Sequence, residues 1–143
     1  PLDELDQIEE KQIVGRAGRY YAKTGELFIN MKYPAVDQMD DQLRKEYAHA
    51  PDPELMQSMS RGHARNSMIQ RVGLGVVFAL AKRLNKEWDE ESMQKALEPE
   101  SLSLAADNYF DSMQDARRSL GTKLKLSRKD EVDEESDEIE AAA

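Results

Sequence analysis

Two clusters of basic side chains are the residues whose type and spacing best fit a chemical task. Residues 11–23 carry four bases and no acid, and residues 61–86 carry six bases and no acid. Lysine and arginine side chains bind phosphate groups, so such clusters are candidate phosphate-binding stripes. The same blocks also fit complementary subunit surfaces or, most simply, solvated helix faces.

Residues that catalyse reactions or hold metals are scarce. The chain has no cysteine, and its only imidazoles are His49 and His63, so we expect no thiol nucleophile and no zinc site. No phosphate-binding loop, nucleophile elbow or zinc-protease motif is present. Ser92 and Lys95 have the spacing of an SxxK motif, but its companion motifs are missing. The sequence therefore predicts a non-enzymatic protein with no cofactor, no catalytic residue and no bound metal.

Most of the net charge of −9 comes from the C-terminal end of the sequence. Residues 128–143 contain eight acidic and two basic residues, and we predict a disordered acidic tail over 130–143 because its apolar content is too low to form a core. The longest uncharged apolar run, 72–81, has ten residues, about half of a membrane span. We therefore expect a soluble protein with no membrane partner and, since no signal peptide precedes Pro1, an intracellular location.

Apolar periodicity predicts a mainly α-helical fold. In the N-terminal region, residues 1–50, helices are predicted over 3–22 and 34–50. The alternating residues 26–33 predict one possible strand, which would pair between subunits or form a loop. This region therefore places the first basic cluster on a helix.

Residues 51–129 are predicted to form an antiparallel helical hairpin. Asp52 followed by Pro53 is typical of a helix start, and apolar residues continue at helical spacing to about Trp88. A last helix, 102–120, repeats apolar residues at alternating spacings of four and three, which indicates a heptad seam.

The long helix is apolar on every side between residues 72 and 81, which requires burial on several sides. One stripe runs through Val72 and Val76, and a second runs beside it through Val77 and Leu84. We predict that a ring-like homo-oligomer buries the excess apolar surface. The predicted oligomer interface consists of Val72, Val76, Leu80, Leu84, Tyr109, Met113 and Leu120.

Residues 12–19 (QIVGRAGR) resemble the sixth motif of superfamily 2 helicases, QxxGRxGR. The resemblance implies that the glutamine and the arginines read nucleotide phosphates between two RecA-like domains. The sequence lacks the phosphate-loop lysine and the DExH box that accompany this motif. We therefore interpret the string as a basic helix face with Arg16, Arg19 and Lys23 at spacings of three and four, and keep a helicase C-terminal fragment as an alternative.

Residues 109–130 resemble the C-terminal end of the oligomerising helix in the small terminase subunits of tailed bacteriophages. There, an Arg- and Leu-bearing helix runs into a turn that is matched here by Leu124, Leu126, Ser127, Arg128 and Lys129. Lys125 stands where glycine is usual, and the family's N-terminal helix-turn-helix is not clearly present.

That resemblance implies a non-enzymatic ring that binds double-stranded viral DNA in the host cytoplasm. The ring would present the DNA to a motor and nuclease partner, a large terminase or a portal-type protein. The DNA-binding residues would form two patches, one of Arg16, Arg19 and Lys23 and another of Arg61, Arg65 and Arg71.

Two other functions would use the same features. A structural ring of a phage virion, such as a head-to-tail connector, needs the same hairpin but uses the basic patches as an interface or a channel lining. A helical adaptor would use the acidic tail to bind a basic partner. The three functions differ in DNA binding and in oligomeric mass.

Overall fold

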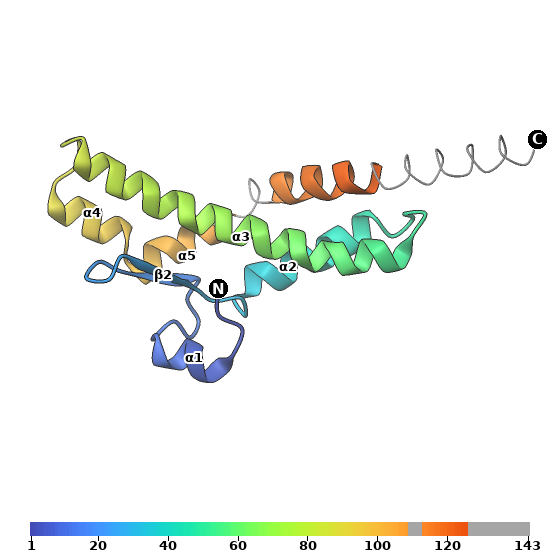
Figure 1. Cartoon of the computed structure of the whole chain (residues 1–143), viewed down its shortest axis with the longest axis horizontal. Helices are drawn as coiled ribbons and strands as arrows, with labels where there is room; N and C mark the ends of the chain where they lie inside the picture. Colours follow the sequence, from blue (N-terminus) through green and yellow to red (C-terminus); the bar gives the residue numbers. More distant parts are fainter. Residues whose placement is uncertain (109–112, 126–143) are drawn as a thin grey trace, which may run out of the picture.

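One long helix, α3 (Pro53–Leu84), runs through the folded body and positions the other elements (Figure 1). The computed structural model describes residues 1–108 and 113–125. The 32 residues of α3 span about 48 Å at the usual helical rise. The Asp52 carboxylate accepts a hydrogen bond from the Leu55 N–H at 2.9 Å, and Pro53 is the first helical residue. The predicted helix start is therefore confirmed, and the helix ends four residues before its predicted limit.

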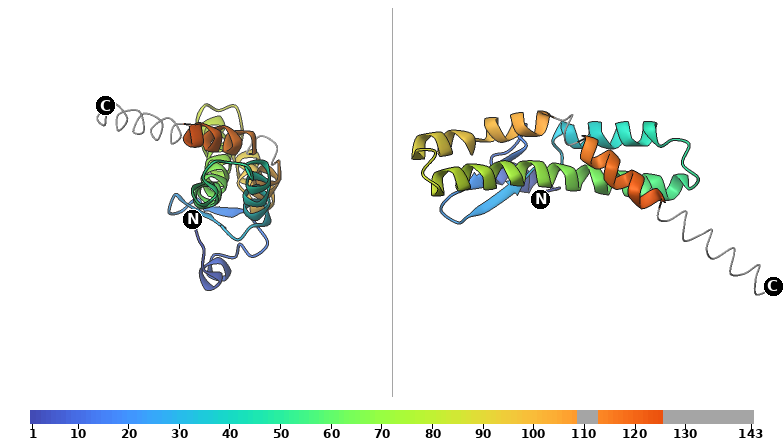
Figure 2. Two further views of the ribbon diagram at one scale, coloured as in Figure 1. Left: turned by 90° about the vertical axis from the view of Figure 1, so that its right-hand side faces the viewer. Right: turned by 90° about the horizontal axis from the view of Figure 1, so that it is seen from above.

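Two sets of helices lie antiparallel to α3, one along each half (Figure 2). The first half lies beside α2 (Pro34–Glu46), and the second lies beside α4 (Glu90–Ala96) and α5 (Pro99–Asp107). A further helical segment, residues 113–125, lies over the first half. The protein is therefore mainly helical, as predicted, with one small two-stranded sheet in its described part.

The N-terminal region differs from the prediction of a helix over 3–22. Helix α1 covers only Leu5–Glu10, and β1 (Gly18–Tyr21) follows it. Gln12 and Gly15 have φ angles of 57° and 68°. These angles lie in the left-handed region of the backbone map, so a right-handed helix cannot continue through them. The string QIVGRAGR is therefore a turn and the start of a strand, and its interpretation as a helix face was wrong.

The predicted strand over 26–33 is shorter and has its partner within the chain. β2 (Glu26–Ile29) pairs antiparallel with β1, with Arg19 opposite Phe28. A Cβ at Gly18 would lie 2.7 Å from the Phe28 carbonyl oxygen, so this close strand contact needs glycine. β1 lies inside the range predicted as a helix, 3–22, so the prediction did not include this strand.

The predicted helix 102–120 is not continuous. α5 ends at Asp107, and Asn108 has non-helical dihedral angles, as is common for asparagine at helix ends. The chain is helical again over 113–125. On both sides of this interruption the predicted apolar positions are buried: Leu102, Ala106, Met113, Ala116 and Leu120.

A single buried cluster connects the predicted N-terminal region with the predicted hairpin. It includes Val36 and Leu43 from α2, Val72 from α3 and Leu120 from the last helical segment. The Tyr33 hydroxyl also donates a hydrogen bond to Asp107 at 2.7 Å, at the point where α2 and α5 meet. None of the helices in the described part of the chain combines the length and apolar character that crossing a bilayer requires. The predicted tail, 130–143, lies outside the described residues.

Candidate functional site

The second half of α3 has a covered face and an open face. Val72, Val76 and Ala79 are buried against the elements beneath the helix. Four large apolar side chains on the other side remain between 55% and 83% exposed. Together with the exposed Ala81 they form what we call the open stripe: Leu74, Val77, Phe78, Ala81 and Leu84. A contiguous apolar surface of this kind is typical of a contact site for another protein chain.

The spacing within the open stripe is that of a helix–helix contact. Leu74 and Val77 are three residues apart, four more lead to Ala81, and Leu84 follows after another three. These are the a and d positions of a heptad repeat. In Figure 1 this half of α3 forms the upper edge of the molecule, with α4 and α5 below it. A helix from another chain therefore has access to the stripe.

The aromatic ring in the open stripe is held by two neighbours. The Phe78 ring meets Trp88 edge-on with 5.6 Å between the ring centroids. The Lys82 ammonium group lies 5.4 Å from the Phe78 centroid. Both are favourable geometries for an aromatic side chain, so Phe78 presents a defined surface.

A groove between α3 and α4 extends the apolar surface. It has a volume of about 720 Å³ and is lined by Leu80 and Met93 together with part of the open stripe. Arg83 and Lys86 also line it, and Arg83 pairs with Glu90 at 3.2 Å. The apolar surface is therefore bordered by basic groups, of which one is neutralised by α4.

The predicted interface residues fall on both sides of this division. Four of them are buried within the protomer: Val72, Val76, Met113 and Leu120. Leu84 lies on the open stripe, Leu80 is half-buried beside it, and Tyr109 lies outside the described residues. Neighbouring stripes on one helix have the same spacing, so the sequence could not indicate which stripe the chain's own core would cover.

The first predicted DNA-binding patch is spread over a turn and the β-hairpin, with acids beside it. Arg16 pairs with Glu100 at 3.3 Å. Arg19 and Lys23 line a groove that also contains Glu98. The three bases therefore do not share one helix face, and nearby carboxylates reduce their attraction for phosphate.

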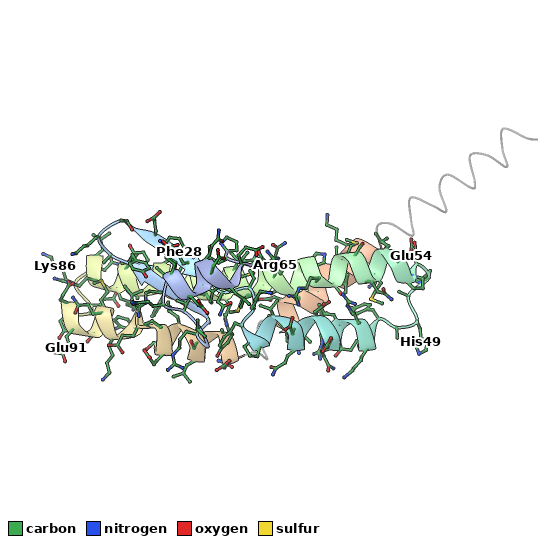
Figure 3. The ribbon with its side chains drawn as sticks, turned by 90° about the horizontal axis from the view of Figure 1, so that it is seen from below. Phe28, His49, Glu54, Arg65, Lys86 and Glu91 are labelled. Atoms are coloured by element: carbon green, nitrogen blue, oxygen red, sulfur yellow. The ribbon has the colours of Figure 1, made fainter. Side chains whose placement is uncertain are left out.

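The second predicted patch is engaged in contacts that hold other segments on α3. Arg65 pairs with Asp3 at 2.9 Å, on the side of α3 that faces the N-terminal segment (Figure 3). This hydrogen bond is the main cause that lowers the pKa of Asp3 and raises the pKa of Arg65. Arg61 pairs with Asp37 of α2, and Arg71 also has an interaction within the chain. DNA binding by these arginines would have to compete with their intramolecular partners.

Sequence reasoning missed a third set of bases, which lies on the segment 113–125. Arg118 and Lys123 line a groove against α3, opposite His63. The signal was visible as the bases of residues 117–129, but the sequence did not indicate which part of α3 they would face.

A buried polar network joins α2 to the first half of α3. The Ser60 hydroxyl donates a hydrogen bond to the Asp40 carboxylate, and the Arg44 guanidinium donates to the same oxygen at 3.0 Å. Asp40 is 6% exposed and Ser60 fully buried, so the two side chains satisfy each other in the interior. No three His, Asp or Glu side chains in the described part of the chain are grouped as metal ligands would be.

Comparisons of the chain with protein-family models, with curated proteins and with solved structures gave no significant match.

Proposed function

We propose that the protein is a non-enzymatic subunit that associates with copies of itself through the open stripe and acts in viral DNA packaging, as small terminase subunits do. The open stripe is the observation that carries this proposal. Its large apolar side chains are exposed in one protomer although they have the spacing of a helix–helix contact. The role in packaging, with a large terminase or a portal-type partner in the host cytoplasm, rests on the sequence resemblance of residues 109–130.

The apolar surface is large enough to support association. Complete burial of a Val, Leu or Phe side chain contributes about 1.5–3 kcal/mol. The four large side chains of the stripe are more than half exposed, so two copies together would gain roughly 8–16 kcal/mol by burying them. This gain is of the same size as the association cost of about 4–15 kcal/mol, so burial of the stripe offsets that cost and the contacts beside the stripe decide the affinity.

A second copy of α3 matches the stripe in an antiparallel arrangement centred on Ala79. In this register Leu74 lies level with Leu84 of the other copy, and Val77 lies level with Ala81. A two-fold axis relates the two helices, as in most homodimers. The arrangement uses every residue of the stripe.

The residues beside the stripe are compatible with this pairing. Phe78 of one copy lies next to Phe78 of the other, and Leu80 lies next to Leu80. Lys82 and Arg83 occupy positions outside the contact, so like charges do not meet. A ring of more copies would require a second contact in addition to this one.

Replacement of Val77 and Leu84 by aspartate tests the proposal. We expect sedimentation velocity to give a dimer or larger assembly for the unchanged protein and a folded monomer for the double variant, because the stripe cannot bury charges. Leu104→Asp is the matched control, since Leu104 is 70% exposed on α5 and should leave the mass unchanged. If the protein without substitutions sediments as a monomer, self-association is refuted.

A structural ring of the virion is a second candidate function. One observation favours it over a DNA-binding ring: Arg16, Arg61 and Arg65, from both predicted DNA-binding patches, are paired with carboxylates of the same chain. An assembly that forms normally but does not retain duplex DNA at low salt would support this candidate.

A further inference from the structure

A polar groove lies between the first half of α3 and the helical segment 113–125. It has a volume of about 430 Å³, and every residue that lines it is polar. One wall carries His63, Asn66 and Gln70 at helical spacing, and the other carries Arg118 and Lys123. No carboxylate is among the lining residues, in contrast to the groove beside the β-hairpin. We call this feature the polar groove.

The cations of the polar groove have no acidic partner in the described part of the chain. Arg117, one residue away from Arg118, pairs with Glu46 through its Nε at 2.7 Å. Arg118 and Lys123 make no such pair with any described carboxylate and are exposed to solvent. Among the residues that the structure describes, their charges are therefore less engaged than those of Arg61 and Arg65.

His63 lies close enough to the positive charge of the groove to respond to it. The pKa of His63 is lowered, first by partial burial and next by the nearby Lys123 ammonium. Both causes disfavour a further positive charge at this position. An anion bound between His63 and Lys123 would act in the opposite direction and raise the pKa of His63.

The chemistry of the walls corresponds to a phosphate group. A guanidinium and an ammonium group supply positive charge, and both bind phosphate oxygens through charge-assisted hydrogen bonds. The side chains of Asn66, Gln70 and Thr122 add neutral donors on the same two walls. Side chains of these types make the backbone contacts of DNA-binding proteins.

We propose that the polar groove binds a phosphate group, carried either by the DNA backbone or by a free phosphate ligand. The DNA source rests on the proposed function, whereas the free phosphate source does not. Phosphate contact therefore belongs to the segment 113–125 and the side of α3 that faces it, and not to the two patches predicted from the sequence.

The first test is an NMR titration of the two imidazoles. Inorganic phosphate, compared with chloride at equal ionic strength, should raise the pKa of His63 and leave His49 unchanged, because His49 lies in the loop after α2. The response at His63 should be lost in the double variant Arg118→Gln, Lys123→Gln. Thermal melting verifies that the variant, altered only at exposed positions, remains folded.

The second test measures binding to a short duplex DNA by fluorescence anisotropy over a series of salt concentrations. If DNA supplies the phosphate, the same double variant should reduce the slope of log affinity against log salt by about 2. The control is Arg16→Gln with Lys23→Gln, which removes the same charge elsewhere and should change the slope less.

The outcomes separate the two sources and the two proposals. A response of His63 to phosphate with a groove-specific loss of DNA affinity supports the DNA source, and the same response with unchanged DNA affinity supports a free ligand. No response of His63 overturns the polar groove, and an equal loss of DNA affinity in both double variants overturns the DNA source. A monomeric protein that still responds to phosphate refutes self-association alone, and an oligomer without the response refutes the groove alone.

Discussion

The two halves of α3 contrast in composition and in cover. Residues 53–68 are mostly polar, yet α2, the N-terminal segment and residues 113–125 surround them (Figures 1 and 2). Residues 69–84 are mostly apolar, yet one side of them remains open. The more polar half is therefore the better covered one, and the apolar half has a surface that its own chain does not complete.

The difference follows from how each half is held. In the first half, polar contacts add to the apolar burial of Ala64 and Met68, among them the Asp40–Ser60 pair and the Arg65–Asp3 pair. The second half is fixed mainly by apolar burial on a single face, where Val72 and Val76 lie. An apolar face that remains exposed beside such a core is explained most simply by a partner helix.

Neighbouring valines on α3 provide the strongest test of this division. Val76→Asp places a charge in the core beneath the helix and should lower the free energy of unfolding by about 4 kcal/mol or more. Val77→Asp changes the open side and should leave the stability of the monomer nearly unchanged while it weakens association. Chemical denaturation of both variants at low protein concentration measures the difference. Equal losses in the two variants would contradict the assignment of the two faces.

The polar network of the first half should have the next largest effect. Asp40→Ala leaves the buried Ser60 hydroxyl with only the distant Gln57 carbonyl oxygen as acceptor, at 3.4 Å, and removes an ion partner from Arg44, so we expect a loss of about 3 kcal/mol. Asp41→Ala removes the adjacent exposed carboxylate and should cost less than about 0.5 kcal/mol. Urea denaturation measures the free energy of unfolding of both variants. If Asp40→Ala leaves this free energy unchanged, the first half of α3 does not depend on the network.

A smaller, pH-dependent effect is expected where residues 113–125 contact α2. The hydrogen bond from Arg117 is the main cause that lowers the pKa of Glu46 below 4.5. Because the folded pKa is the lower one, this pair stabilises the protein above pH 4.5 and loses its effect as the pH falls through the folded pKa. Glu46→Gln should therefore cost about 0.5–1 kcal/mol at neutral pH and almost nothing in acid.

Unfolding curves of the Glu46→Gln variant and the unchanged protein between neutral and acidic pH measure this dependence. Glu10→Gln, at an exposed position of α1, serves as the control. A cost that persists unchanged in acid would show that the Glu46 charge is not responsible.

The sequence predicted the long elements well because their signals are local. Asp52 and Pro53 mark the start of α3, and the alternating spacing of 102–120 identified positions that are indeed buried. The β-hairpin was missed because Gly18 and Gly15 act through backbone conformation, which apolar periodicity does not report. Short elements of this kind depend on close contacts between segments rather than on their own pattern.

The candidate sites were less predictable than the fold. Whether an arginine is available for a ligand depends on the carboxylate beside it, and the partner of Arg65 lies 62 positions away at Asp3. Spacing along the chain does not distinguish the two apolar stripes of α3, whereas packing covers Val76 and exposes Val77. Both questions are decided by tertiary contacts, which the spacing along one helix does not contain.

The mass of the unchanged protein in solution tests the central claim most directly. Light scattering during size-exclusion chromatography over a range of concentrations should give an even multiple of the 16.3 kDa chain mass, because pairing through the open stripe joins copies two at a time. A constant mass of 16.3 kDa at every concentration would contradict the claim, and the open stripe would then require a partner other than a second copy.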